Sequence, residues 1–333
     1  LDFWPLFRRD WYDSMLGTHA MMNCLILNAV EKTLSQMKRQ RMGVYIQENQ
    51  AWEMALNYAW RSAGHGPLVG VPHATVRYWD LRYFHDPRSY RRSGRNDLPL
   101  PDVVALNGPA AVAAYRSGSY PESQIVEVEA LRYLYLADLQ GIGQTENRRP
   151  SRSPRVLVLG DYLPAATRRQ MRLLSGAAAS LPSNTRYVMK PHPSCPVKAS
   201  EYPSLRLLAF SRPLAELLCE CDIAYASNIT SAAVDAYCAG VPVVSVLEGS
   251  TLNMSPLRGL KNTIYVADCE ELANALLAAC DDHSRDHAPP FFCLDRDMPR
   301  WKKLLGINRF DARPRQGADG GASEADHTDT LLQ

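Results

Sequence analysis

Residues 186–193 read Arg-Tyr-Val-Met-Lys-Pro-His-Pro, a short apolar run that ends in two prolines on either side of a histidine. The apolar run predicts the end of a buried strand. Pro191 and Pro193 stop that strand, because proline fixes its own φ angle and favours an extended residue before it. Lys190 and His192 are thereby held beyond the carboxyl end of the strand, the edge at which open α/β sheets bind ligands. A cation and an imidazole at this edge predict a phosphate site.

A second signal of the same kind lies at residues 226–236, Ala-Ser-Asn-Ile-Thr-Ser-Ala-Ala-Val-Asp-Ala. It follows another apolar run and opens a helical pattern, so its hydroxyl groups lie where a helix would begin. The N-terminus of a helix attracts anions, because its first backbone N–H groups have no partner within the helix. Two such signals at strand ends predict a site for a nucleotide sugar, with either one or two phosphates.

Strand and helix patterns alternate along most of the chain, which predicts parallel sheets covered on both faces. A linker rich in glycine and proline is expected at residues 137–155. We therefore expect two Rossmann-like α/β domains facing a cleft, residues 1–145 and 146–310, and a disordered tail at residues 311–333. The expected strands are 43–46, 68–71, 103–106, 155–159, 186–189, 222–225 and 242–246. The expected helices are 18–38, 51–59, 110–117, 164–179, 212–219, 231–239 and 269–280.

Composition narrows the class of protein. The 333 residues include 37 Lys or Arg and 35 Asp or Glu, so the net charge of +2 does not indicate nucleic-acid binding. The eight cysteines form no CxxC pair and several lie in apolar patterns, which favours reduced core residues of a cytoplasmic protein without a metal site. No apolar run reaches the ~18–20 residues that span a bilayer. The chain begins at Leu1 rather than methionine, so the sequence leaves open a further N-terminal segment of the first domain.

The two ends of the chain carry weaker patterns. Residues 1–12 mix aromatic and basic side chains, and we expect a packed N-terminal turn there; the alternative is an element that lies on a membrane surface or faces the acceptor. Residues 289–306 are expected to cross back or to cap the fold.

Several of these motifs resemble those of known families. Lys190-Pro191-His192-Pro193 is similar to the His-Pro motif of bacterial sialyltransferases and Kdo transferases, and residues 227–231 are similar to their later Ser/Thr motif. Four further stretches resemble a family of O-antigen or capsule biosynthesis proteins: residues 4–7 (WPLF), 47–53 (QENQAWE), 79–84 (WDLRYF) and 252–259 (LNMSPLRG). The similarity covers roughly residues 1–310 and implies a GT-B fold, in which the first domain serves the acceptor and the second binds the nucleotide sugar.

The resemblance also implies a reaction. In those families the imidazole and hydroxyls bind the phosphate of a CMP-sugar, and no cofactor or metal is needed. It implies a cytoplasmic glycosyltransferase that moves a sialic, legionaminic or pseudaminic acid or Kdo from CMP to a glycan or lipid-linked glycan. Peripheral contact with the inner membrane, to which the basic and aromatic residues 1–12 point, stays open. A UDP-, GDP- or CDP-donor transferase of the teichoic-acid or capsule type, a nucleotide-sugar epimerase and a non-catalytic scaffold stay open as alternatives.

Sugar transfer needs a group that takes the proton of the acceptor and groups that stabilise the leaving phosphate. We assign His192 to the phosphate and Glu48 to the proton, with His73 as the alternative base or a sugar contact. The sialyltransferases carry two acidic residues and a glycine at the strand end that corresponds to residues 47–49, whereas this chain reads Gln-Glu-Asn.

The remaining candidates surround these two groups. Gly160 would let a ligand approach the backbone, Glu248 would bind ribose hydroxyls, and Arg258 would pair with a carboxylate of the donor sugar. The other donor-side candidates are Lys190, Pro193, Ser227, Asn228, Thr230, Ser231, Asn253 and Ser255, and the acceptor-side candidates are His73, Asp80 and Arg82.

Overall fold

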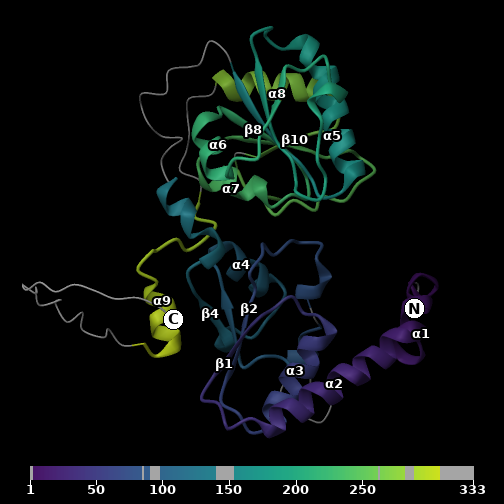
Figure 1. The fold of residues 1–333 in the computed structure, drawn as a ribbon, viewed down its shortest axis with the longest axis vertical. Coiled ribbons are helices and arrows are strands. Elements are labelled where there is room, and N and C mark those ends of the chain that lie inside the picture. The colour runs from purple at the N-terminus through teal and green to yellow at the C-terminus, as the bar shows by residue number, and fades with distance from the viewer. Residues whose placement is uncertain are drawn as a thin grey trace, which may run out of the picture.

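Two parallel β-sheets, one in each half of the chain, form the framework of the molecule (Figure 1). The computed structural model describes residues 3–84, 86–90, 98–139, 154–261, 263–281 and 289–307. The first sheet has the strand order β1-β2-β3-β4, and the second has the order β10-β9-β8-β5-β6-β7. The expected disordered tail and the expected boundary between residues 145 and 146 lie outside the described residues.

The first sheet consists of β1 (Gly43–Ile46), β2 (Leu68–Val71), β3 (Val103–Leu106) and β4 (Ile125–Glu127). Helices α3 (Ala51–Ser62) and α4 (Pro109–Ser117) connect its strands. Both faces of the two central strands are buried, as expected for parallel strands with continuous apolar runs.

The second sheet consists of β5 (Arg155–Leu159), β6 (Arg186–Lys190), β7 (Leu207–Ala209), β8 (Ile223–Ser227), β9 (Val243–Val246) and β10 (Thr263–Val266). Its helices are α5 (Pro164–Ala177), α6 (Leu214–Glu220), α7 (Ala232–Cys238) and α8 (Cys269–Asp281). Successive side chains of β5 point to opposite faces: Val156 and Val158 pack with α5 and α8, whereas Leu157 and Leu159 pack with α6 and α7. The strand order reverses between β5 and β8, and this switch point is where doubly wound sheets bind ligands.

The C-terminal part of the described chain returns to the first sheet, which confirms the expectation for residues 289–306. Helix α9 (Pro299–Leu305) places the buried indole of Trp301 against Val69, Ala105 and Val128. Figure 1 shows α9 beside β4, far from the second sheet that precedes it in the chain.

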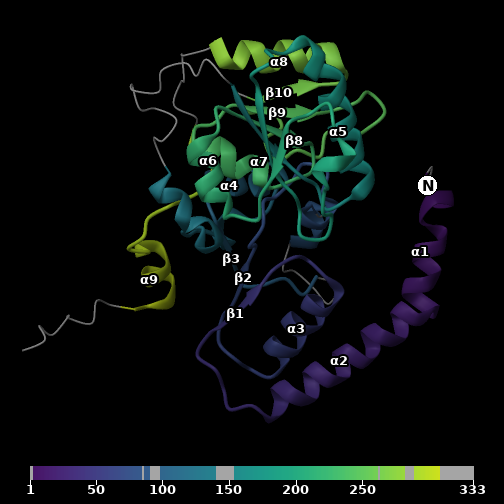
Figure 2. The same ribbon diagram turned by 45° about the horizontal axis from the view of Figure 1, so that its top comes forward.

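The expectation of a packed N-terminal turn is wrong. Residues 4–16 form helix α1 (Trp4–Leu16), which has no buried residue, and Gly17 separates it from α2 (Thr18–Gln36). Only the end of α2 packs on the body, where Leu34 joins the core of α3. Figures 1 and 2 both show α1 and the first half of α2 standing away from the two sheets.

The strands β4, β7 and β10 were not expected from the sequence. Each lies at the edge of its sheet and is only partly buried, and β4 and β7 have three residues each, so their sequence patterns are short. No helix among the described residues is long and apolar enough to span a membrane.

Candidate functional site

Loops from the two halves of the molecule meet beyond the carboxyl ends of their strands. The guanidinium of Arg258, in the loop after β9, lies 3.9 Å from the ring centroid of Tyr78, in the loop after β2. The hydroxyl of Tyr135, in the 3₁₀ segment Leu131–Asp138, donates a hydrogen bond to the carboxylate of Asp235 on α7. The candidate site therefore lies along the edge at which parallel sheets bind ligands.

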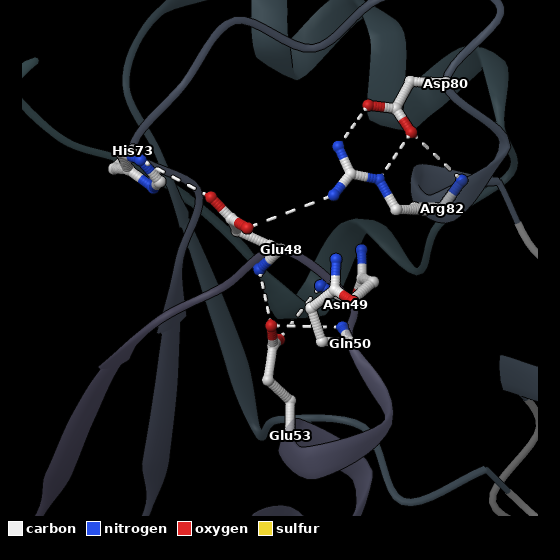
Figure 3. A network of polar contacts seen from close by, with 7 residues as sticks. All are labelled: Glu48, Asn49, Gln50, Glu53, His73, Asp80 and Arg82. Carbon is white, nitrogen blue, oxygen red and sulfur yellow. Dashed lines mark hydrogen bonds and ion pairs between the residues drawn. The ribbon is translucent and has the colours of Figure 1, made fainter. Parts of the chain in front are cut away.

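In the first domain, the structure brings together all four of the acceptor-side and base candidates (Figure 3). Glu48 follows β1, and its carboxylate lies 3.6 Å from Nε2 of His73 and 4.0 Å from a terminal nitrogen of Arg82. Arg82 in turn donates two hydrogen bonds to Asp80, at 2.8 and 2.7 Å. Glu48 is 41% exposed, so a substrate can reach the carboxylate while His73 and Arg82 remain beside it.

The ion pair of Arg82 and Asp80 sets the charge of this cluster. The hydrogen bonds from Arg82 lower the pKa of Asp80, and the same contacts raise the pKa of Arg82. Both groups therefore stay charged at neutral pH. The cation of Arg82 offsets the negative charge that Glu48 and Asp80 place near one another.

A buried carboxylate that the sequence analysis missed holds Glu48 in place. Glu53 is 1% exposed and accepts hydrogen bonds from the backbone N–H groups of Glu48, Asn49 and Gln50 at 2.8, 3.0 and 3.1 Å (Figure 3). Asn49 has a φ of +56°, a left-handed conformation that asparagine tolerates and that helps aim the three groups at one anion. Gln50 is the N-cap of α3, and Glu53 follows it at the spacing of a capping box. This spacing could have identified Glu53 from the sequence.

In the second domain, His192 follows β6 and has a defined tautomer. Its Nδ1 accepts a hydrogen bond from the backbone N–H of Ser194 at 3.2 Å and lies 2.7 Å from the Ser194 hydroxyl. Because Nδ1 is the acceptor, the neutral ring carries its proton on Nε2. Pro193 lies in the turn that the hydrogen bond from Cys195 N to His192 O closes at 2.9 Å. The imidazole therefore offers one N–H donor, next to the ring of Tyr162 at a centroid distance of 6.1 Å.

The Ser/Thr motif follows β8 at the switch point, and its residues divide into two groups. Ser227 is buried and donates a hydrogen bond to the carboxylate of Asp161, which is fully buried after β5. Asn228 donates to the carbonyl of Leu252 at 2.9 Å. Thr230 and Ser231 are half-buried at the start of α7. The first pair thus joins loops of the protein, and the second pair holds the hydroxyls available to a ligand.

Gly160 lies in close contact with the loop after β6. A Cβ at this position would lie 3.1 Å from the backbone nitrogen of His192 and 3.2 Å from Cα of Pro191. The end of β5 therefore packs directly against the loop that carries His192.

Lys190 and Glu248 have partners inside the protein. The ammonium of Lys190 donates to the carbonyls of Ser211 and Arg212 at 3.1 and 2.6 Å. The carboxylate of Glu248 lies 3.0 Å from the guanidinium of Arg169 on α5. These contacts give both side chains a role in fixing the loops, which residue type alone did not indicate.

The loop after β9 is likewise organised by its own polar groups. Asn253 accepts a hydrogen bond from the backbone N–H of Ser255 at 3.0 Å, and Ser255 is 3% exposed. Arg258, expected to face a donor carboxylate, lies on the ring of Tyr78. Its cation is thus directed at an aromatic face in the other domain.

Asp235 is a titratable group at the contact between the two halves that the sequence analysis did not single out. It is 6% exposed, and burial raises its pKa from the ordinary value of 3.8 to about 6. Its partner Tyr135 comes from the segment that precedes the second sheet, so only the fold brings the two side chains together.

The raised pKa of Asp235 predicts that stability falls as the pH rises from about 4 to about 6. Over this range the folded protein holds a proton that the unfolded chain has lost, so the folded state is favoured at the acidic end. The contribution is about 3 kcal/mol, at about 1.36 kcal/mol per pKa unit. Urea unfolding at several pH values should show this decline in the wild type and not in Asp235→Asn. The exposed Asp297→Asn serves as the control, and parallel profiles for Asp235→Asn and the wild type would contradict the assignment.

Within the described ranges, no three His, Cys, Asp or Glu side chains gather in a way that would hold a metal ion. The groups at the candidate site instead offer proton transfer at Glu48 and His73 and hydrogen-bond donation at His192.

No protein-family model and no curated protein matches this sequence. Several solved structures, however, are similar to it in fold. UDP-GlcNAc 2-epimerase from Methanocaldococcus jannaschii is 13% identical, with a TM-score of 0.56 over 88% of this chain and 84% of its own. MnaA of S. aureus, solved with UDP, is 13% identical, with a TM-score of 0.53 over 86% and 80%. A putative UDP-N-acetylglucosamine 2-epimerase from Listeria monocytogenes is 13% identical, with a TM-score of 0.52 over 80% and 72%.

These similarities, together with the two parallel sheets, confirm the expected α/β, GT-B-like fold. At 13% identity they are similarities of fold.

Proposed function

We propose that this protein is an enzyme that acts on nucleotide sugars, with the phosphate beside His192 in the second domain and Glu48 of the first domain as the acid–base group. One observation carries the proposal. Nδ1 of His192 accepts its hydrogen bond from Ser194, so Nε2–H is the donor, one strand away from the switch point of the sheet. A donor placed there, with the hydroxyls of Thr230 and Ser231, suits a phosphate oxygen.

The reaction that we propose first is transfer of the sugar to a hydroxyl of a glycan or lipid-linked glycan. The bond between the anomeric carbon and the phosphate oxygen breaks, and the phosphate leaves with the electron pair. The acceptor oxygen bonds to the anomeric carbon as its proton passes to Glu48. His192 donates a hydrogen bond to the leaving phosphate as its charge develops. We propose that no bound cofactor takes part, which turnover in the presence of EDTA tests.

A nucleoside-diphosphate sugar is the donor that we favour. The three solved structures described above are named for UDP-GlcNAc epimerases or contain UDP. The CMP-linked acidic sugar that the motifs imply is the second donor class. It has less support, because Arg258, the residue expected to bind the sugar carboxylate, lies on the ring of Tyr78.

Epimerisation of the nucleotide sugar is the second candidate reaction, and the same three structures favour it. Inverting a sugar carbon by proton transfer needs one group that removes the proton and one that returns it, which suits the neighbouring Glu48 and His73. Incubation with UDP-GlcNAc in the absence of an acceptor distinguishes the two reactions. NMR would show a new epimer in one case and unchanged sugar in the other.

Replacing His192 by alanine is expected to weaken nucleotide binding by about 10–100-fold, because a hydrogen bond to a charged group contributes ~1.5–3 kcal/mol. Calorimetric titration with UDP, CDP, GDP and CMP measures the affinity and identifies the nucleobase that the protein prefers. The exposed His19→Ala is the matched control. Wild-type affinity in His192→Ala, or no binding of any nucleotide by the wild type, would count against the proposed site.

A further inference from the structure

Helix α1 presents an aromatic face that nothing in the described chain covers. Phe7, Trp11 and Met15 are 58%, 54% and 58% exposed, and with Trp4 they share one side of the helix at a spacing of three to four residues. The rings of Trp4 and Trp11 pack edge to face at 6.3 Å, so the face is ordered within one helix. Helix α1 and the first half of α2 form an arm, and Figure 2 shows α1 at its far end, away from both sheets.

The apolar surface continues into α2. Residues 14–30 contain no Asp, Glu, Lys or Arg, and Met21, Met22 and Leu25 are 58%, 46% and 56% exposed. Ten large apolar side chains between residues 3 and 25 are exposed: Phe3, Leu6, Phe7, Trp11, Tyr12, Met15, Leu16, Met21, Met22 and Leu25. Their exposed area is on the order of 1,000 Å², above the few hundred Å² that soluble monomers usually expose.

The kinds of residue and their charges favour a lipid surface over a second protein. Tryptophan and tyrosine prefer the boundary between water and lipid. Leu6 and Leu16 are exposed on other sides of α1 than the aromatic face, so the apolar residues surround α1 instead of forming the single seam of a helix pair. Arg8 and Arg9 of α1 are balanced by Asp10 and Asp13, whereas residues 32–41, at the other end of α2, hold four Lys or Arg and no Asp or Glu. Residues 3–42 are therefore cationic as a whole, and anionic lipid headgroups attract them.

We propose that α1 and the first half of α2 bind in the interface of an anionic lipid bilayer. The aromatic face enters the boundary between headgroups and acyl chains, and the arginines of α1 contact the headgroups. The arm belongs to the domain that carries Glu48, so it holds this domain at the membrane. The inference goes beyond the proposed function and does not depend on it.

Sedimentation with vesicles tests the inference on the full chain. The wild type is expected to bind vesicles that contain both phosphatidylglycerol and phosphatidylcholine. It should bind vesicles of pure phosphatidylcholine less well. The variant Phe7→Ser/Trp11→Ser/Met15→Ser should bind at least about tenfold more weakly, because each side chain loses its apolar burial in lipid. A control variant changes three exposed apolar residues elsewhere: Leu131→Ser/Leu208→Ser/Ile264→Ser. Arg8→Gln/Arg9→Gln should weaken binding to the anionic vesicles and leave binding to pure phosphatidylcholine unchanged.

Two outcomes would overturn the inference. In the first, neither vesicle binds the wild type. In the second, light scattering without lipid shows a dimer that the triple variant dissociates, which assigns the face to a second copy of the chain. Nucleotide affinity of the triple variant, measured in parallel, should equal that of the wild type, so failure of the membrane inference and failure of the nucleotide site are distinguishable.

Discussion

Replacing Glu48 by glutamine is expected to lower turnover by about 10²–10⁴-fold, the usual contribution of a positioned general base. Glutamine keeps the size of the side chain and its backbone position, which Glu53 fixes through the N–H of residue 48. It cannot accept the proton of an acceptor hydroxyl. Nucleotide affinity should not change, because the proposed phosphate site lies in the other domain, beside His192.

Steady-state rates with the donor identified by titration, together with the nucleotide dissociation constant, measure this effect. Glu201→Gln, an exposed glutamate in the second domain, is the control. Normal turnover in Glu48→Gln would remove Glu48 from the mechanism and leave His73 as the base. Normal nucleotide binding with freely replaceable Glu48 and His73 would favour a protein that binds the nucleotide without catalysis.

The arrangement of the fold was predictable because its central strands are apolar on both faces. β5 has the bounds that were expected, and β6 and β8 differ from expectation by two residues or fewer at either end. Of the edge strands, β1 was expected and β4, β7 and β10 were missed. β4 is half-buried along its whole length, so its residues show neither a continuous apolar run nor a clean alternation.

The first-domain part of the site was predictable from the positions of its residues at strand ends. Glu48 and His73 follow neighbouring parallel strands, and the carboxyl ends of such strands lie at one edge, so their side chains meet. Asp80 and Arg82, which the sequence analysis named as acceptor-side candidates, join them from the segment between β2 and β3.

The second-domain part was less predictable, because residue type does not show which way a polar side chain turns. Ser227 has a hydroxyl that could bind a phosphate, yet this hydroxyl donates a hydrogen bond to Asp161, which lies 66 positions earlier in the chain. A buried carboxylate needs such a partner, and this requirement outweighs exposure to a ligand. Lys190 is similar, since its ammonium is held by two carbonyls of a loop that only the fold places nearby.

Replacing Trp301 by alanine is expected to lower the free energy of unfolding of the first domain by about 3–5 kcal/mol. The indole is 8% exposed and packs on Val69, Ala105 and Val128. Its Nε1–H donates to the carbonyl of Glu129 at 2.8 Å. The variant therefore leaves a cavity and an unpaired carbonyl in one place, and both effects lower stability.

Urea unfolding followed by circular dichroism measures the loss, with Trp11→Ala as the matched control because that indole is exposed. The control should differ from the wild type by no more than about 0.5 kcal/mol in the absence of lipid. Since Trp301 lies more than 170 positions after Glu129, the large effect requires the C-terminal helix to be part of the first domain in solution. A loss below about 1 kcal/mol in Trp301→Ala would mean that the first sheet is stable without α9.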